Sequence, residues 1–187
     1  MKVFYEPGTL NSTADLVREF QTLSKKSCAF LRAIPADRFF AHPAEGWSIA
    51  ENVKHLSKTT LPITLGLKLP SAIPSVMFGK GNGSRSFAEV RAAYYASLEG
   101  GFQAGIYTPG KAAEPATAAQ TADQERLIKK LEKSIAGLVT AFSTIEDKIL
   151  DSVRMPHPAI GRITIREMLY SSLNHDIHHM SVVAARI

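Results

Sequence analysis

Apolar residues recur at three- and four-residue spacing in four long stretches of the chain, which is the periodicity of an amphipathic helix. Leu16, Phe20 and Leu23 carry this pattern in the first stretch, and polar residues fill the positions between them. The pattern predicts four long helices, over residues 12–34, from 48 to 62 or 66, over 121–150, and from 164 onward.

Polar residues at the predicted starts support these helices. Three of the starts have a capping box, in which Ser or Thr precedes Glu or Gln by three residues. The pairs are Ser48 with Glu51, Thr121 with Gln124, and Thr164 with Glu167. Ser12 or Thr13 can cap the first helix, which Pro35 ends. We expect the second helix to end near Pro62 or Gly66.

The segment between the second and third helices, residues 67–120, is rich in Pro, Gly and Ser. We expect a long crossover there, with one short extra helix over residues 86–99 that a pair of glycines ends. Strand-like alternation is confined to residues 162–165. The predicted fold is therefore all-α: one domain over residues 1–187, built as a four-helix bundle with a long crossover insertion between helices 2 and 3.

The composition is ordinary for a globular protein, with 45% hydrophobic and 21% charged residues. The net charge of +5 does not indicate nucleic-acid binding, because the basic residues are scattered and form no familiar nucleic-acid motif. We expect no membrane span, because the most apolar stretch, residues 61–78, contains Lys68 and three prolines. The single Cys28 and the lack of a signal-like apolar run near Met1 predict a cytoplasmic protein.

Half of the six histidines fall within five residues near the C-terminus: His175, His178 and His179. His175 and His179 are four residues apart and share the inner face of the last helix, so both imidazoles can reach one metal ion. His178 points away from that face, toward solvent or another surface. His55 flanks the buried face of the second helix and is the candidate third ligand, because a bundle places that helix beside the last one.

Other interpretations of the histidines stay open. A lone buried histidine is more often a hydrogen-bonded core residue than a ligand, and His42 and His157 lie in proline-containing loops. The run His175-Asp176-x-x-His179 also resembles the zinc-protease motif His-Glu-x-x-His, but Asp is shorter than the Glu that acts there as general base. A serine nucleophile is poorly supported, because no Gly-x-Ser-x-Gly turn occurs.

Two parts of the chain resemble a known family. Residues 46–56 (GWSIAENVKHL), and residues 161–169 (GRITIREML) followed by 175–179 (HDIHH), are similar to the start of the second helix and to the last helix of the DinB/YfiT-like family of predicted metalloenzymes. Together with the helix count, the resemblance covers nearly the whole chain. It implies a four-helix bundle with up-down-down-up topology, which is often dimeric.

The resemblance also implies a divalent metal, zinc or nickel, on His55, His175 and His179, with His178 as a non-ligand. Three protein ligands leave positions open for water or substrate. Some members are transferases or isomerases that use a low-molecular-weight thiol, which the metal would hold as thiolate. Val182 is a departure: many members carry Gln three residues after the last histidine, so a polar group that could orient a substrate is absent here.

We therefore expect a divalent-metal-dependent enzyme that acts on a small-molecule substrate, with transfer to a low-molecular-weight thiol as the first hypothesis. A metal-dependent hydrolase that uses metal-activated water is the alternative, and a non-catalytic bundle that binds a small molecule or a partner is the third. Glu51, Asn52 and Ser172 are candidates to support the ligands, by helical proximity. A homodimer is the expected assembly.

Overall fold

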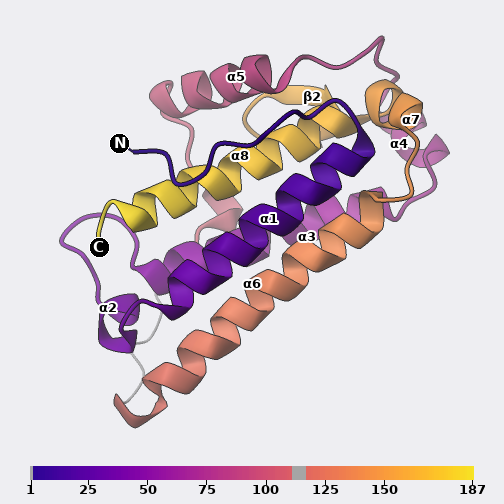
Figure 1. Ribbon diagram of the computed structural model, residues 1–187. Helices are drawn as coiled ribbons and strands as arrows, with labels where there is room; N and C mark the ends of the chain where they lie inside the picture. The colour runs from indigo at the N-terminus through magenta and orange to yellow at the C-terminus, as the bar shows by residue number, and fades with distance from the viewer. Residues whose placement is uncertain (1, 111–116) are drawn as a thin grey trace.

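The computed structural model describes residues 2–110 and 117–187. Within them the protein is mostly helical, with eight α-helices, two short 3-10 helices and one two-stranded sheet (Figure 1). The elements are α1 (Thr13–Arg32), α2 (Ala36–Phe40), α3 (Ile49–Leu67), α4 (Ala72–Phe78), α5 (Phe87–Glu99), η1 (Gly105–Tyr107), η2 (Thr117–Ala119), α6 (Gln120–Phe142), α7 (Asp147–Ser152), β1 (Arg154–His157), β2 (Gly161–Thr164) and α8 (Ile165–Ala184).

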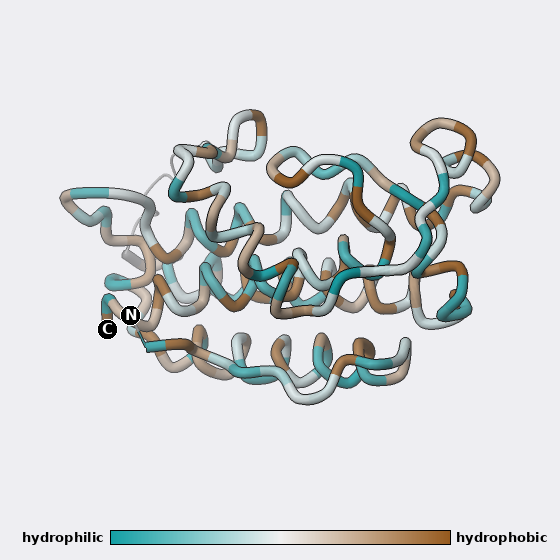
Figure 2. Tube along the Cα trace, turned by 90° about the horizontal axis from the view of Figure 1, so that it is seen from above, coloured by the Kyte–Doolittle hydropathy of each residue, from teal (hydrophilic) through white to brown (hydrophobic). Residues whose placement is uncertain are grey.

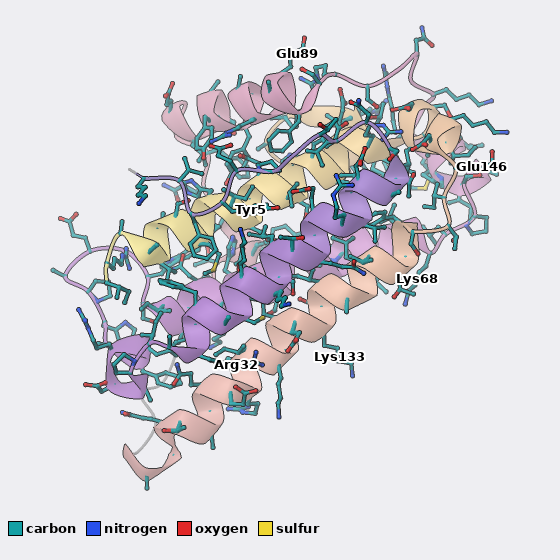
Figure 3. All side chains as sticks on the ribbon, viewed as in Figure 1. Tyr5, Arg32, Lys68, Glu89, Lys133 and Glu146 are labelled. Carbon is teal, nitrogen blue, oxygen red and sulfur yellow. The ribbon has the colours of Figure 1, made fainter. Side chains whose placement is uncertain are left out.

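The four longest helices, α1, α3, α6 and α8, enclose the hydrophobic core. Both α6 and α8 pack against α1 and against α3. Phe20 of α1 meets Phe142 of α6 with ring centroids 5.7 Å apart, and both rings are fully buried. Apolar positions recur along each helix in Figure 2, as expected of amphipathic elements. On the outer side, Arg32 of α1 binds Glu125 and Glu132 of α6 (Figure 3).

The predicted capping signals are confirmed at three of the four long helices. The N-cap residues are Ser12, Ser48 and Thr164, and each forms a capping box with Asp15, Glu51 and Glu167 respectively. The helix α3 passes through Pro62 and ends at Leu67, one residue beyond Gly66. Its predicted end near Gly66 is thus confirmed, whereas Pro62 does not end it.

The start of α6 differs from its prediction. This helix begins at Gln120 without a side-chain cap, so the predicted capping box of Thr121 and Gln124 is wrong. The buried amide of Gln124 donates instead to the main-chain oxygens of Leu31 and Ile34, 2.9 Å away in each case. Those carbonyls lie at the end of α1, where the last carbonyls of a helix have no i+4 N–H within the helix. The side chain of Gln124 therefore makes a tertiary contact with the end of α1 and does not cap its own helix, although the local pattern predicted that it would.

The end of α6 differs as well. The helix stops at Phe142 rather than near Leu150, and α7 follows as a separate helix. Asp147 at the start of α7 accepts hydrogen bonds from the main chain of Thr13 and from the guanidinium of Arg166. These bonds to the starts of α1 and α8 fix the direction of α7. They are tertiary contacts, so the apolar periodicity could not predict them.

The crossover contains two α-helices where the sequence predicted one. The predicted helix over residues 86–99 is confirmed as α5, which packs against α8 (Figure 1). The unpredicted helix, α4, contains Pro74 at its third position, where a proline is tolerated because the first-turn N–H groups have no helical acceptor. Residues 111–116 of the predicted crossover lie outside the described part of the chain.

A two-stranded antiparallel hairpin leads into α8. The strand β2 (Gly161–Thr164) overlaps the predicted alternating segment over residues 162–164, and in its pairing with β1 Met155 lies opposite Ile163. The strand β1 was not predicted, because Pro156 interrupts it. A proline is acceptable here since a two-stranded sheet has only edge strands. The hairpin places His157 at the end of β1, close to the middle of α8.

The polar side of α8 opposite His175 and His179 is not exposed. Glu167, Asn174 and Ser181 are each at most 5% exposed. The N-terminal segment covers part of this side, where the main-chain N–H of Phe4 donates to Ser181 Oγ. The crossover covers another part, where Arg85 binds Glu167. The helix that carries the candidate ligands is therefore enclosed on this side as well.

Over residues 2–110 and 117–187, no single helix is both long enough and apolar enough to cross a membrane. The helices α3 and α4 reach the length and hydropathy of a membrane span only when they are taken together, and a bend of 105° separates them.

Candidate metal centre

Three imidazoles from two helices meet in the interior of the protein. His55 of α3 and His175 and His179 of α8 each place one ring nitrogen within 4.8 Å of the others, and they are the one such group among the described residues. The Nε2 atoms of His55 and His175 are 3.0 Å apart. Nitrogens bound at about 2.0–2.1 Å to a tetrahedral metal lie about 3.3 Å apart, so this donor set fits a single zinc-like ion.

Hydrogen bonds at the outer nitrogens orient two of the three rings. Nδ1 of His55 lies 2.8 Å from the main-chain oxygen of Tyr107, and Nδ1 of His179 lies 2.8 Å from Oδ1 of Asn52. Because both partners are acceptors, each Nδ1 carries the proton and each Nε2 keeps its lone pair. Metal-binding histidines are typically held in this way by an outer carbonyl or carboxylate.

Asn52 is itself fixed in one orientation. Its Nδ2 donates to the main-chain oxygens of Ser48 and Trp47, at 2.9 and 3.3 Å, which leaves Oδ1 to face His179. The residue is 2% exposed, so no water competes for this contact. The start of α3 therefore positions a ring on α8, and the predicted supporting role of Asn52 has a concrete geometry.

Replacing Asn52 with alanine is expected to weaken metal binding about 10- to 100-fold, because His179 loses the acceptor that fixes its tautomer. The affinity is measured by competition with a chromophoric chelator. Asn52→Asp is the matched control: it keeps an oxygen acceptor and should bind metal at least as tightly as the wild type. Equal affinities for the alanine variant and the wild type would contradict the assigned contact.

Burial keeps the three imidazoles neutral. It lowers the pKa of His175 to about 4 and that of His179 well below its ordinary value. Burial together with the neighbouring His175 lowers the pKa of His55 to about 4. All three are therefore unprotonated at neutral pH, which is the form that binds a metal.

The carboxyl group of Asp176 lies beside this cluster. It is 3% exposed, and burial raises its pKa to about 8 despite the opposing effect of His55. Its Oδ1 is 3.9 Å from Nδ1 of His175, which is longer than a hydrogen bond. A divalent cation at the three imidazoles would favour the charged form of this carboxyl.

Aromatic rings enclose the cluster, and the sequence did not identify them. Trp47 stacks on His179 with an interplanar angle of 4° and also lies 4.8 Å from the ring centroid of His55. Gly46 makes the preceding turn with φ of +80°, a backbone conformation that favours glycine. From α5, Tyr94 meets His175 edge to face. The available signal was that the single tryptophan directly precedes a capping box.

His178 lies outside the group of three. Its ring packs against Tyr94 and Tyr95 of α5, with centroids 6.0 and 5.8 Å apart. It therefore faces another surface of the protein, which is one of the two positions that the helical periodicity allowed.

The remaining residues from the sequence fall in two places, the start of α3 and the cavity next to the metal centre. Glu51 caps α3, and its carboxylate lies 3.7 Å from Nδ1 of His42, away from the ligand nitrogens. Ser172 lines the cavity next to the metal centre. His157 lines the same cavity, but Ala159 and Ile160 donate to its Nδ1. This ring nitrogen is thus already occupied.

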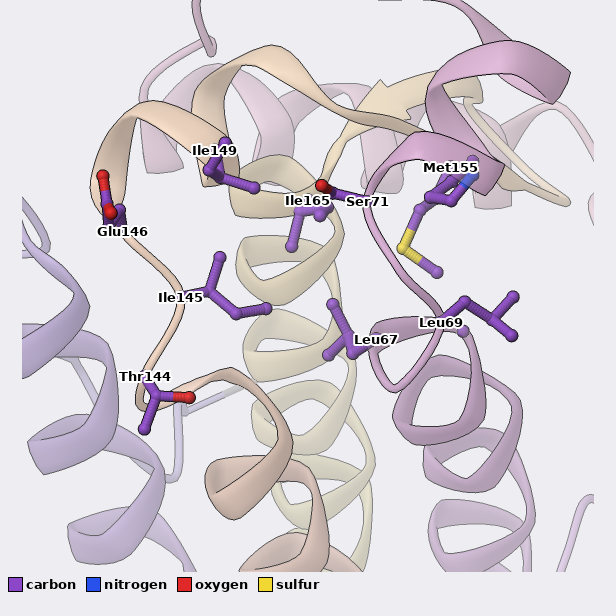
Figure 4. A pocket seen from close by; sticks show the side chains of 11 residues that line it. Leu67, Leu69, Ser71, Thr144, Ile145, Glu146, Ile149, Met155 and Ile165 are labelled. Atoms are coloured by element: carbon purple, nitrogen blue, oxygen red, sulfur yellow. The ribbon is translucent and has the colours of Figure 1, made fainter.

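Two cavities lie along α3. The larger, of about 720 Å³, opens directly onto His55, His175 and His179. The smaller, of about 270 Å³, lies between the end of α3 and the α6–α7 connection, and Leu67, Ile145 and Ile165 point into it (Figure 4). Among the residues that line these two cavities, histidines occur only at the larger one, which is therefore the cavity next to the candidate metal centre.

A family model described as the DinB superfamily matches residues 19–183. No curated protein and no solved structure matches.

Proposed function

Since the chain belongs to the DinB superfamily, we propose that it is a divalent-metal-dependent enzyme whose ligands are His55, His175 and His179. One observation carries the proposal: a ring nitrogen of each of the three histidines lies within 4.8 Å of the other two. The histidines come from two helices, and His55 and His175 are 120 residues apart in the sequence. Zinc and nickel are the metals that we favour, because the resemblance to the family implies them and imidazole nitrogens suit both.

We propose a four-helix bundle with up-down-down-up order as the scaffold. The contacts of α6 and α8 with both α1 and α3 support it. In Figure 1, α1 and α8 begin at the upper right, whereas α6 begins at the lower left, where α2 leads into α3. This order places α3 and α8 side by side, which the proposed ligand set requires.

The reaction that we propose is transfer of a group to a low-molecular-weight thiol. A bound divalent cation supplies Lewis-acid chemistry and lowers the pKa of a thiol or of water. The protein's own residues bind and orient the metal, and Trp47 and Tyr94 exclude bulk water from it. Val182, where many family members carry Gln, is not among the residues that line the cavity. Hydrolysis on the same ligands is the alternative reaction.

A thiol panel tests the proposed reaction. We expect the untagged, metal-replete protein to accelerate conjugation of monochlorobimane with at least one of glutathione, bacillithiol and mycothiol. His175→Ala should show the uncatalysed rate, because it loses the metal. Acceleration of ester cleavage without any thiol would instead support the hydrolase. Equal rates for the variant and the wild type in both assays would contradict both enzyme hypotheses and favour the non-catalytic bundle.

We also propose that the protein is a cytoplasmic homodimer with a small-molecule substrate. Exposed leucines support a dimer: Leu61 and Leu65 on the outer face of α3, and Leu69 just beyond the end of this helix, are 57%, 55% and 49% exposed. Leu65→Glu is expected to shift the sedimentation coefficient to that of a monomer, and Lys129→Glu on α6 is the control that should stay dimeric. A monomeric wild type at micromolar concentration would contradict this assembly.

A further inference from the structure

The wall of the larger cavity is uncharged. Among the described residues that line it, none is Asp, Glu, Lys or Arg. Aromatic side chains contribute much of the wall, from Trp47, Phe78, Tyr94, Phe102 and Tyr107. An ionised group without a partner is costly to bury, whereas apolar and aromatic surface gains from burial. The volume of about 720 Å³ suits a small organic molecule.

Ser171 and His157 are two of the polar residues in this largely apolar wall, and they form a hydrogen-bonded pair. The main-chain N–H groups of Ala159 and Ile160 donate to Nδ1 of His157, at 3.1 and 3.2 Å. Nδ1 is therefore an acceptor, so in the neutral ring the proton is on Nε2. Burial, with the neighbouring His175, lowers the pKa of His157 to about 4, which keeps the ring neutral. Nε2–H then donates to Oγ of Ser171, 3.0 Å away.

This arrangement leaves Ser171 with a hydrogen to donate. Its Oγ accepts from His157, and no hydrogen bond among the described residues uses the hydroxyl hydrogen. Ser171 is 1% exposed and is among the residues that line the cavity, so a ligand bound there is the partner available to this hydrogen. It precedes His175 by four residues on α8, which places the two on one face about 6 Å apart along the axis.

We propose that the cavity binds an uncharged, largely apolar ring compound that carries an oxygen acceptor, such as a carbonyl, and that Ser171 donates a hydrogen bond to this oxygen. The bound oxygen lies one helical turn from the candidate metal ligand His175, so Ser171 determines which part of the molecule meets the metal. This inference rests on the proposed function for its reactive end, but its binding component does not need the metal.

Three related probes test the chemistry of the cavity: 2-acetonaphthone, 2-ethylnaphthalene and 2-naphthoate. The first carries a carbonyl, the second replaces it with an alkyl group, and the third carries a charge. Trp47 is the single tryptophan and lines the cavity, so quenching of its fluorescence, corrected for probe absorbance, reports binding. Binding is measured on the protein as purified and again after chelation, because a metal would attract the carboxylate.

In the chelated protein we expect the ketone to bind most tightly. Loss of the carbonyl should weaken binding about 5- to 10-fold, which is the effect of one hydrogen bond. The naphthoate should bind more than about 10-fold more weakly than the ketone, because its charge finds no partner. Ser171→Ala should abolish the difference between the ketone and the alkyl probe, and Ser172→Ala, an adjacent residue of the same wall, should preserve it.

Two results would overturn the inference. One is tighter binding of naphthoate than of the ketone after chelation, and the other is an unchanged ratio of ketone to alkyl affinity in Ser171→Ala. If that variant does not fold, as judged by circular dichroism, equal wild-type affinities for ketone and alkyl probes overturn it instead. The metal content of the purified sample is measured separately, so a failure of the proposed function is distinguished from a failure of this inference.

Discussion

His175→Ala is expected to weaken metal binding at least about 1,000-fold, because it removes one of three ligands and loss of an outer partner alone costs about 10- to 100-fold. Nε2 of His175 lies 3.0 Å from Nε2 of His55, so the variant removes a nitrogen at the centre of the donor set. The affinity is measured by competition with a chromophoric chelator, using protein without a histidine tag.

His178→Ala is the matched control for this experiment. The residue is also a histidine on α8, but its ring packs on Tyr94 and Tyr95, and it is not part of the group of three. The variant should therefore keep the wild-type affinity within a few-fold. If the two alanine variants retain metal equally, the assignment of ligands to the inner face of α8 is wrong.

The second large effect concerns stability. Asp151→Ala is expected to lower the free energy of unfolding by about 2–3 kcal/mol, because it leaves the buried guanidinium of Arg166 short of a partner. Arg166 is 5% exposed, and its Nε lies 2.6 Å from Oδ1 of Asp151. The carboxylate also accepts from Ser84 of the crossover. The expected loss is below that of a fully buried pair, because the Asp151 side chain is 34% exposed.

Urea denaturation at neutral pH measures this loss, and the exposed pair of Asp123 and Arg126 on α6 supplies the control. Asp123→Ala should cost less than about 1 kcal/mol. Burial alone would raise the pKa of Asp151, but hydrogen bonds from Arg166 and Ser84 lower it below its ordinary value. Its contribution is therefore present above the unfolded pKa of about 3.9 and is lost as the pH falls below it. A small loss like that of the control would show that the ion pair stabilises little.

The same network explains why the crossover could not be placed from sequence. Ser84 also contacts the N-cap hydroxyl of Thr164, 2.6 Å away, and the main-chain N–H of Gly81 donates to Ser152. A Cβ on Gly81 would lie 2.9 Å from the Thr164 methyl group, so a side chain there would collide. These contacts join residues about 70 to 80 positions apart, and no local pattern encodes them.

The candidate ligands could be predicted because helical periodicity carries directional information. His175 and His179 share a face by their spacing of four, and His55 and Asn52 lie on the flank of a helix that packs against α8. The other residues around the site come from irregular segments: Trp47 from a turn, Tyr107 from η1 and His157 from an unpredicted strand. Such segments have no periodicity, so their directions emerge only from tertiary packing.

The enclosure of α8 is a further feature that the sequence concealed. Polar residues such as Glu167 and Asn174 usually mark a solvent-facing side. Here they lie beneath the crossover and the N-terminal segment, which have weak helical signals. The burial of this helix lowers the pKa values of its histidines. The neutral imidazole, which is the form that binds a metal, is stabilised as a result.

The central claim is that imidazoles from α3 and α8 bind one divalent ion through Nε2. X-ray absorption at the metal edge of the untagged protein, with metal content measured on the same sample, tests it most directly. We predict close to one metal per chain and three imidazole nitrogens at about 2.0–2.1 Å. A content below about 0.2 metal per chain, or a shell containing fewer than three imidazoles, would contradict the claim, since a site of three histidines is normally well occupied.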